Sequence, residues 1–425
     1  MRRSWIGMAI ATGAWLALAA CGSGGNGGSP TASDVGVTKT QITLGATVPL
    51  SGPAAAYGTI AKASEAYFNY VNAHGGVNGR KIKYVYLDDS YDPSKTVPLT
   101  HQLVEQSQVF LTFGGLGTQA QTSVQQYLNA KKVPQVFVAS GATTFAAGHD
   151  ASGHNYPYTF GWQPVYQGEA LVYAQYVLQS LPNAKIGVIY QNDDYGQDYL
   201  NGLKKGLGAK AASMIVDTQG NDSTAKDLSS QIVHLKASGA DTFFIFETPG
   251  PAITALVTAN AIGWHPTIFL NSVSAPIPYV QIAQKAAKDP AAVNGLYSVT
   301  YLKDALSPQL QSDAGIKLYK SVMSQYYPAG NVNDGFNLYG IATAWSMVDV
   351  LKNAGTNPTR ASVLDALNHL NEANNPFLLP GVSITNTPSS HYSITQEEIE
   401  KYDAAAGDYS TVSALINFRG KVKFP

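Results

Sequence analysis

Cysteine and charged residues are both scarce in this sequence. The 425-residue chain contains one cysteine, Cys21, so no intramolecular disulfide can form. Charged residues make up 13% of the chain, the formal net charge is -1, and no long basic run follows Arg3. Such a chain offers no electrostatic reason to bind nucleic acid. Its hydrophobic fraction of 45% predicts a folded body, and its length suits two lobes better than one core.

Sequence motifs of catalysis and metal binding are also missing. None of the eight histidines is spaced as in H-E-x-x-H, no G-x-S-x-G nucleophile elbow occurs, and no G-x-G-x-x-G follows a strand-like segment. His149 and His154 share a loop with Asp150, where a metal site is one interpretation and a solvated loop is the one that we favour. We therefore expect a protein that is not an enzyme and that uses no cofactor and no metal.

Three aspartates precede Pro93, at positions 88, 89 and 92. Their order, D-D-x-x-D-P, lacks the glycine and the distal glutamate of an EF-hand calcium loop. We interpret them as a strand-end loop that caps a helix beginning at Pro93.

The single long apolar run lies at the N-terminus, at residues 6–18, after two arginines. It is followed by Ala19, Ala20 and Cys21, and the run Leu-Ala-Ala-Cys resembles the bacterial lipobox, in which the cysteine carries a lipid. Residues 4–20 are short of the roughly 20 apolar residues that a membrane-spanning helix needs. We expect a lipoprotein signal peptide at residues 1–20, lipidation at Cys21, and a flexible Gly- and Ser-rich tether at residues 21–40.

Strand-like and helix-like segments alternate along the chain. We expect strands at residues 42–48, 81–87, 109–113, 136–139, 185–190, 214–217, 242–246 and 268–270. We expect helices at residues 57–73, 93–106, 118–131, 195–207, 225–237 and 251–261. This alternation is typical of α/β folds with parallel sheets, and its restart near residue 160 predicts two doubly wound lobes.

Three later helical segments, at residues 308–327, 334–352 and 358–370, come without a clear set of strands. We expect them to return and cover the first lobe rather than to form a third domain. The tail from Gly381 has the pattern of strands and turns.

Several strand-to-helix turns are rich in glycine and hydroxyl residues. They are Ser51-Gly52-Pro53, the run Gly114-Gly115-Leu116-Gly117-Thr118, Ala139-Ser140-Gly141-Ala142, and Asn271-Ser272. Ligands of open α/β sheets bind beyond the carboxyl ends of the strands, where helix N-termini offer free N–H groups to an anion. Each turn taken singly is also explained as a helix N-cap.

Six motifs in order resemble the type I periplasmic binding proteins of the leucine/isoleucine/valine-binding kind. They are S-G-P-x-x-x-Y-G from Ser51, N-x-x-G-G-V-N-G-R from Asn72, D-D-x-x-D-P from Asp88, V-P-Q from Val133, Q-N-D-D-Y-G from Gln191 and K-A-S-G-A-D from Lys236. The resemblance implies two lobes joined by three hinge crossings, near Phe160, Thr300 and Leu379. The N-terminal lobe is then 41–160 plus 301–379, and the C-terminal lobe 161–300 plus 380–425.

The resemblance also implies where a ligand binds. Thr118 and the stretch Ala139-Ser140-Gly141 match the positions that hold an α-carboxylate in amino-acid-binding members, and Tyr57, after Ser51, matches a ligand-contacting tyrosine. Thr248 and Ser272 stand where those members carry an aromatic and an acidic residue for the α-ammonium. Without that acid a buried ammonium lacks its charge partner, so we expect a carboxylate without one.

Aromatic residues follow the first crossing. Tyr166 and Tyr195 are candidates for an apolar pocket wall together with Tyr57, or alternatively core residues, and for Trp162 we favour the core. The resulting hypothesis is a monomeric, extracytoplasmic lipoprotein that captures an aromatic or aliphatic carboxylate for an ABC permease and ATPase. The alternatives are branched-chain amino acid binding by the same fold, or a ligand-sensing receptor domain, which needs a transmembrane and a signalling segment after the binding domain.

Overall fold

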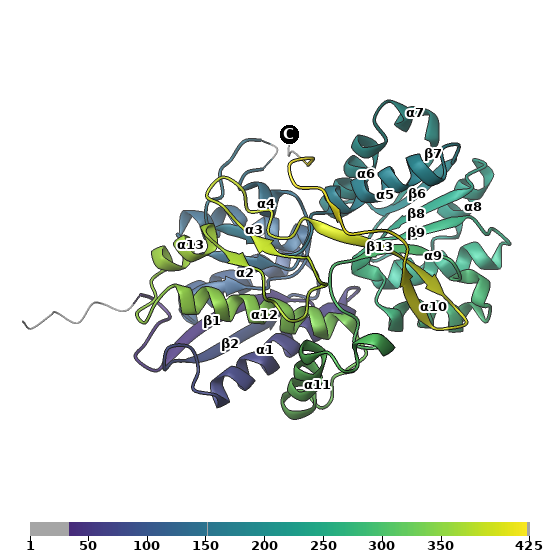
Figure 1. Cartoon of the computed structure of the whole chain (residues 1–425). Helices are drawn as coiled ribbons and strands as arrows, with labels where there is room; N and C mark the ends of the chain where they lie inside the picture. The colour runs from purple at the N-terminus through teal and green to yellow at the C-terminus, as the bar shows by residue number, and fades with distance from the viewer. Residues whose placement is uncertain (1–33, 151, 423–425) are drawn as a thin grey trace, which may run out of the picture. The chain divides into compact units, whose positions relative to one another are not determined.

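The computed structural model describes residues 34–150 and 152–422 (Figure 1). The predicted signal peptide, Cys21 and residues 21–33 of the predicted tether lie outside the described residues. Among the described helices, none is both long and apolar enough to cross a membrane.

The first sheet has five parallel strands in the order β2-β1-β3-β4-β5. The strands are β1 (Gln41–Val48), β2 (Lys81–Asp88), β3 (Leu111–Phe113), β4 (Gln135–Val138) and β5 (Thr159–Gly161). After its first residue, β1 is buried at every position, because a central parallel strand is covered on both faces. The covering helices from this part of the chain are α1 (Gly58–Ala73), α2 (Pro93–His101), α3 (Thr118–Ala130) and α4 (Thr144–Ala147).

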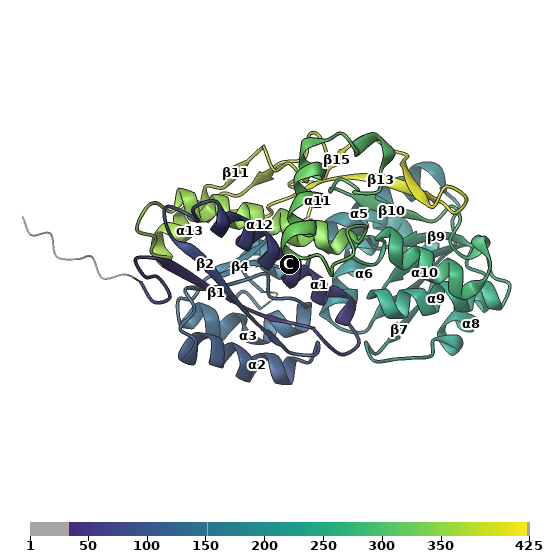
Figure 2. The same cartoon turned by 90° about the horizontal axis from the view of Figure 1, so that it is seen from below.

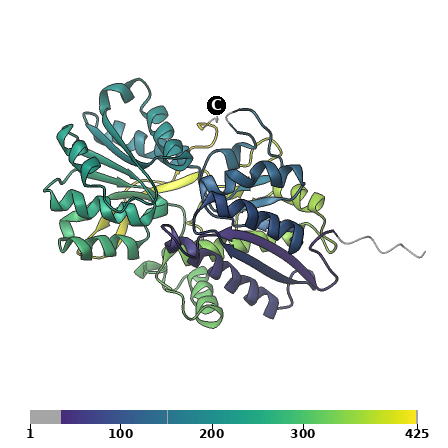
Figure 3. The same cartoon turned by 180° about the vertical axis from the view of Figure 1, so that it is seen from behind.

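The late helices α11 (Ala314–Tyr326), α12 (Gly335–Asn353) and α13 (Arg360–Asn368) return to this sheet, as predicted (Figures 1 and 3). The Ser64 hydroxyl of α1 donates to the Gly340 carbonyl of α12 at 2.8 Å. A Cβ on Gly340 would lie 2.4 Å from the Ile60 carbonyl oxygen, so only glycine allows these two helices to approach this closely.

The second sheet has the order β14-β13-β10-β9-β8-β6-β7, with β15 paired to β13. Its strands are β6 (Ile186–Gln191), β7 (Ile215–Asn221), β8 (Thr242–Phe246), β9 (Thr267–Leu270), β10 (Tyr297–Thr300), β13 (Gln396–Asp403), β14 (Asp408–Thr411) and β15 (Ile416–Asn417). Strands β6 to β10 are parallel, and β13 adds antiparallel to β10 (Figure 2). Its helices are α5 (Tyr166–Ser180), α6 (Asp194–Leu207), α7 (Ala211–Met214), α8 (Ser229–Ala237), α9 (Pro249–Ala261) and α10 (Ile277–Ala287). The predicted α/β class with two parallel-sheet cores is therefore confirmed.

We predicted the third connection between the two sheets near Leu379, and the segment that follows contacts the cores of both sheets. Leu302 and Leu378 form an antiparallel bridge, so the connection after Thr300 runs beside the segment near 379. Ile384 and Ile394, however, still pack in the hydrophobic core of the first sheet, and the chain joins the second sheet only at β13. A small sheet of β11 (Asn371–Glu372) and β12 (Ile384–Thr385) holds Ile384 beside the first sheet, whereas Tyr392 packs against the core of the second sheet. The predicted lobe boundaries, including the one near Leu379, stay a prediction.

The described part of the predicted tether differs from a flexible chain. Val37 is buried and bridges to Ile42, and Gly36 lies with its Cα against the backbone of Phe110. Asp34 accepts a hydrogen bond from the Arg360 amide at 2.7 Å. Residues 34–40 therefore belong to the folded body, since apolar Val37 and the conformational freedom of Gly36 let them pack on the first sheet.

Candidate ligand-binding site

A cavity of about 390 Å³ lies where loops of both sheets meet, and seven of the ten predicted binding residues line it. These seven are Tyr57, Thr118, Ala139, Tyr166, Tyr195, Thr248 and Ser272. The loops come from the carboxyl ends of the parallel strands, where such sheets bind ligands. Ser51, Ser140 and Gly141 are not part of the lining.

The N-terminus of α3 presents a buried hydroxyl pair. The Oγ1 of Thr118 and the Oγ of Ser140 lie 2.8 Å apart, and both residues are 2% exposed. Ser140 also accepts the Ala142 amide proton at 3.1 Å, so it supports Thr118 from behind the cavity wall. Gly117, the residue before α3, has no side chain that could cap the helix, so the first N–H groups of α3 are free.

Glycines on this wall make room for aromatic rings. Gly117 has a φ of +99°, and a Cβ there would lie 2.8 Å from the ring of Tyr91, another lining residue. A Cβ on Gly141 would lie 2.6 Å from the ring of Tyr166. Gly141 thus shapes the cavity indirectly, because its lack of a side chain lets the Tyr166 ring lie against its backbone.

Tyrosines form much of the cavity wall. The Tyr166 ring stacks on Tyr199 at a centroid distance of 4.4 Å and meets Tyr195 edge-on at 5.1 Å. The Tyr57 hydroxyl donates to the Val273 carbonyl at 2.9 Å, and the Tyr195 hydroxyl to the Glu247 carbonyl at 2.8 Å. Burial raises the pKa of Tyr57, Tyr166 and Tyr195, so all three stay neutral at physiological pH.

A buried carboxylate that our sequence reasoning missed stands behind Ser272. Glu169 Oε1 accepts the Ser272 amide proton at 2.8 Å, and Oε2 accepts its hydroxyl proton at 2.7 Å. Tyr199 donates to the same carboxylate at 2.9 Å, and the Tyr173 hydroxyl lies 3.0 Å from it and 2.9 Å from the Leu270 carbonyl, which competes for the tyrosine's one proton. Burial raises the pKa of Glu169, while its contacts with Ser272, Tyr199 and Tyr173 favour the ionised form.

Thr248 is the N-cap of α9 but makes no side-chain capping hydrogen bond. It is buried and lines the cavity directly before Pro249, the first residue of that helix. A second helix N-terminus therefore borders the cavity, with its partial positive charge toward the ligand space.

One part of the cavity wall is acidic. Asp304, Glu400 and Asp408 line it beside Lys303, whose ammonium is already bound to Asp313 at 2.8 Å. Burial, and then the neighbouring Asp304 and Asp408 carboxylates, raise the pKa of Glu400 well above its usual range. The sequence carries no local signal for this group, because pairing of β10, β13 and β14 brings its members together.

Ser51 serves the turn rather than the cavity. It is exposed, and its hydroxyl donates to Asp88 at 2.6 Å. Burial opposes ionisation of Asp88, but this bond and the amide protons of Ser90, Leu50 and Ser51 lower its pKa overall.

Asp92 caps α2 through the Ser94 amide at 2.9 Å, which confirms the capping interpretation of the aspartates. Trp162 is fully buried and donates to Ser346 at 3.0 Å, which confirms it as core.

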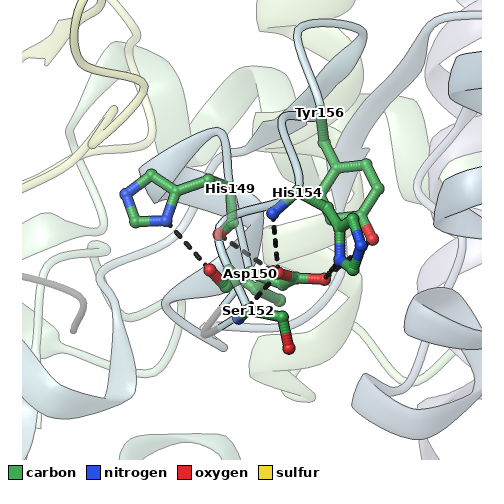
Figure 4. A network of polar contacts seen from close by, with 6 residues as sticks. His149, Asp150, Ser152, His154 and Tyr156 are labelled. Carbon is green, nitrogen blue, oxygen red and sulfur yellow. Dashed lines mark hydrogen bonds and ion pairs between the residues drawn. The ribbon is translucent and has the colours of Figure 1, made fainter.

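The histidines of the 148–156 loop do not converge on one point (Figure 4). The Asp150 carboxylate accepts from the amides of Ser152 and His154 and from the Tyr156 hydroxyl, and it also lies 2.9 Å from the ring of His154. The His149 ring turns to the Asp150 carbonyl instead, at 3.1 Å. Within residues 34–150 and 152–422 there is no group of three or more His, Cys, Asp or Glu side chains that could hold a metal ion.

Comparison with known proteins identifies the family. Residues 41–396 match the family described as periplasmic binding protein. The chain belongs to that family. Its members are extracytoplasmic proteins that bind small solutes, and the predicted likeness to leucine/isoleucine/valine-binding proteins is confirmed.

Among curated relatives, this periplasmic binding protein is 28% identical over 205 residues to "Leu/Ile/Val-binding protein homolog 3" of Brucella melitensis. That match covers 48% of this chain and 54% of the relative, and the chain spans about half the length of several curated relatives that it matches. It is 24% identical over 293 residues to "Amino acid binding protein" of Pseudomonas aeruginosa, which covers 69% of this chain and 73% of the relative.

Two solved structures have the same fold. A fatty acid ABC transporter substrate-binding protein from Thermomonospora curvata superimposes with a TM-score of 0.75 at 22% identity, covering 92% of this chain and 97% of that one. A branched chain amino acid ABC transporter protein from Thermus thermophilus, with bound valine, superimposes with a TM-score of 0.78 at 19% identity, covering 90% and 97%.

Proposed function

We propose that this chain is the lipid-anchored solute-capturing component of an ABC importer, and that it binds an aromatic or aliphatic carboxylate without an α-ammonium. A permease and an ATPase are then its partners, and it catalyses no reaction. The anchor rests on the sequence around Cys21, and the importer on the family and on the transporter names of its structural neighbours.

The observation that carries the ligand class is the Thr118–Ser140 hydroxyl pair at the uncapped N-terminus of α3. Free N–H groups, the helix dipole and a hydroxyl proton all favour an anion at this place. An anion is disfavoured beside Asp304, Glu400 and Asp408, so the carboxylate belongs at Thr118.

The state of Glu169 argues against an α-ammonium at Ser272. A carboxylate has about four lone-pair sites, and Glu169 receives three hydrogen bonds from Ser272 and Tyr199, while the single Tyr173 proton lies between Glu169 and the Leu270 carbonyl. Glu169 therefore uses most of its acceptor capacity within the fold, and it does not line the cavity, although it is hydrogen-bonded to Ser272.

Branched-chain amino acid binding is the second candidate function. The acidic wall of Asp304, Glu400 and Asp408 favours it, because an ammonium placed there gains a charge partner. A thermal-shift screen of the soluble chain with benzoate-like acids, short fatty acids, leucine and valine separates the two, since a ligand that binds only the folded state raises the melting temperature. Stabilisation by leucine or valine alone would refute the first proposal.

A further inference from the structure

Two hydroxyl residues of the second lobe line the cavity at the ends of neighbouring strands. Thr248 follows β8 by two residues, and Ser272 follows β9 by two residues. The two chains stay side by side beyond their last paired residues, because Asn271 Nδ2 donates to the Glu247 carbonyl at 3.1 Å. Neighbouring strands lie about 4.8 Å apart, so Thr248 and Ser272 are close neighbours at this edge of the sheet.

Both side chains lie on the side of the sheet that α5 and α6 cover. The backbone is extended at Thr248, so its side chain shares a face with that of Phe246, whose ring stacks on Tyr199 of α6 at a centroid distance of 4.7 Å. The Ser272 hydroxyl meets Glu169 of α5 at 2.7 Å. A single ligand group between the two hydroxyls can therefore contact both.

The Thr248 hydroxyl is free to pair with a ligand. Among the described residues it has no hydrogen-bond partner, although Thr248 is only 2% exposed. Its oxygen is not sealed among protein atoms, and the residue lines the cavity, so the hydroxyl opens on the ligand space. Leaving a buried hydroxyl unpaired is costly, so this position favours a polar group of the ligand.

The Ser272 hydroxyl, in contrast, offers a ligand only an acceptor. Its single proton goes to Glu169 Oε2 at 2.7 Å, which leaves the oxygen lone pairs for the cavity that Ser272 lines. Donation to a carboxylate also makes this oxygen a better acceptor. The group that fits here donates to Ser272 and accepts from Thr248.

The N-terminus of α9 does not suit a second carboxylate at this place. Its first and third residues, Pro249 and Pro251, have no N–H group. Gly250 supplies the one N–H of the first three helical positions. An anion that needs several donors is therefore better held by α3, whose first turn contains no proline.

Other polar groups satisfy one of the two hydroxyls but not both. A ketone oxygen accepts from Thr248 but places its lone pairs against those of Ser272. An ammonium donates to Ser272 but is desolvated beside no carboxylate, because Glu169 does not line the cavity. A hydroxyl accepts one hydrogen bond and donates the other, and it adds no charge.

We propose that the carboxylate ligand carries a hydroxyl group on carbon 2 or carbon 3, which accepts a hydrogen bond from Thr248 and donates one to Ser272. This inference rests on the proposed function, in which Thr118 and the N-terminus of α3 hold the carboxylate. The Tyr166 ring adjoins both ends, since it lies against the Gly141 backbone and stands one helical turn before Glu169 on α5. With one ring between the two ends, the hydroxyl belongs close to the carboxylate.

Calorimetric titration of the wild-type protein with acids of one carbon body tests this inference. The acids are 4-methylpentanoate, its 2-hydroxy and 3-hydroxy derivatives and 2-oxo-4-methylpentanoate, and the corresponding set built on 3-phenylpropanoate is titrated in parallel. Two added hydrogen bonds between neutral groups should make one of the hydroxy acids bind about tenfold more tightly than its parent acid. The 2-oxo acid should bind no more tightly than the parent.

Thr248→Val keeps the shape of the side chain and removes a hydroxyl that the fold does not use. It should reduce the preference for the hydroxy acid to about threefold or less, without weakening the binding of the parent acid. Thr254→Val is the matched control, because Thr254 lies on the same helix, donates to the Gly250 carbonyl at 3.2 Å and does not line the cavity. It should keep the full preference.

Equal binding of the hydroxy acids and their parent acids by the wild type would overturn this inference and leave the proposed function standing, as would an undiminished preference in Thr248→Val. Tighter binding of leucine than of every acid in both sets, or no binding of any of these acids, would overturn the proposed function together with it.

Discussion

Replacing Thr118 by valine removes one hydroxyl from the cavity and keeps the shape of the side chain. In the structure this hydroxyl lies 2.8 Å from Ser140 Oγ, which itself accepts the Ala142 amide proton at 3.1 Å. If Ser140 donates to Thr118, the proton of Thr118 is left for a ligand carboxylate. A hydrogen bond to a charged group contributes about 1.5–3 kcal/mol, so Thr118→Val should weaken binding roughly ten- to hundredfold.

Calorimetric titration of a carboxylate found in the thermal-shift screen measures this loss. Thr122→Ala is the matched control, because Thr122 lies on the same helix, bonds back to the Thr118 carbonyl at 3.0 Å and does not line the cavity. Its affinity should stay within about twofold of the wild type. The uncharged amide of the same ligand should lose much less affinity on Thr118→Val, since the bond is then between neutral groups. Equal binding of the carboxylate by Thr118→Val and the wild type would refute the assignment of this hydroxyl.

Three further predictions follow from other parts of the chain. Cys21→Ala should leave a folded protein in the soluble fraction, and detergent-dependent fractionation with membranes would show that Cys21 is not the anchor. Ligand should draw the two lobes together, because contacts from both sets of loops form fully only around the ligand, and an unchanged radius of gyration in small-angle scattering would argue against it. Burial raises the pKa of Glu372 to about 7 from an ordinary 4.5, so the folded state holds its proton more tightly than the unfolded state and stability falls as pH rises from 4.5 to 7. Glu372→Gln should therefore increase the free energy of unfolding in urea at pH 8 relative to the wild type, by more than at pH 4.5; an equal change at both pH values would show that Glu372 does not titrate in this range.

Strong periodicity made most of the fold predictable. The expected strand at 242–246 is β8, and the expected helix at 118–131 is α3 to within one residue. Helix α5 escaped prediction because apolar residues lie all around it, so no polar face gives the pattern of an amphipathic helix. With α5 unrecognised, Glu169 in its first turn could not be placed under Ser272.

The candidate site was predictable where it lies next to a strand end. Thr118, Ala139, Thr248 and Ser272 each follow a parallel strand closely, and the structure brings all four to one cavity. Ser51 follows a strand as well, yet its turn points the hydroxyl to Asp88, a local preference that spacing does not reveal.

The acidic part of the cavity wall could not be predicted from the spacing of residues in the sequence. Asp304 and Glu400 are about a hundred residues apart in the sequence, and antiparallel pairing of β13 with β10 alone makes them neighbours. Such a group follows from tertiary structure rather than from any local motif.

Calorimetric comparison of leucine with 4-methylpentanoate, the same carbon body without the α-ammonium, tests the proposed ligand class most directly. Glu169 is occupied by Ser272 and Tyr199 and does not line the cavity, while Thr118 and the free N-terminus of α3 receive a carboxylate in either compound. We predict that 4-methylpentanoate, or its aromatic counterpart 3-phenylpropanoate, binds at least tenfold more tightly than the corresponding amino acid, a difference of about 1.4 kcal/mol. Tighter binding of leucine than of 4-methylpentanoate would contradict the account and place the ammonium at the acidic wall.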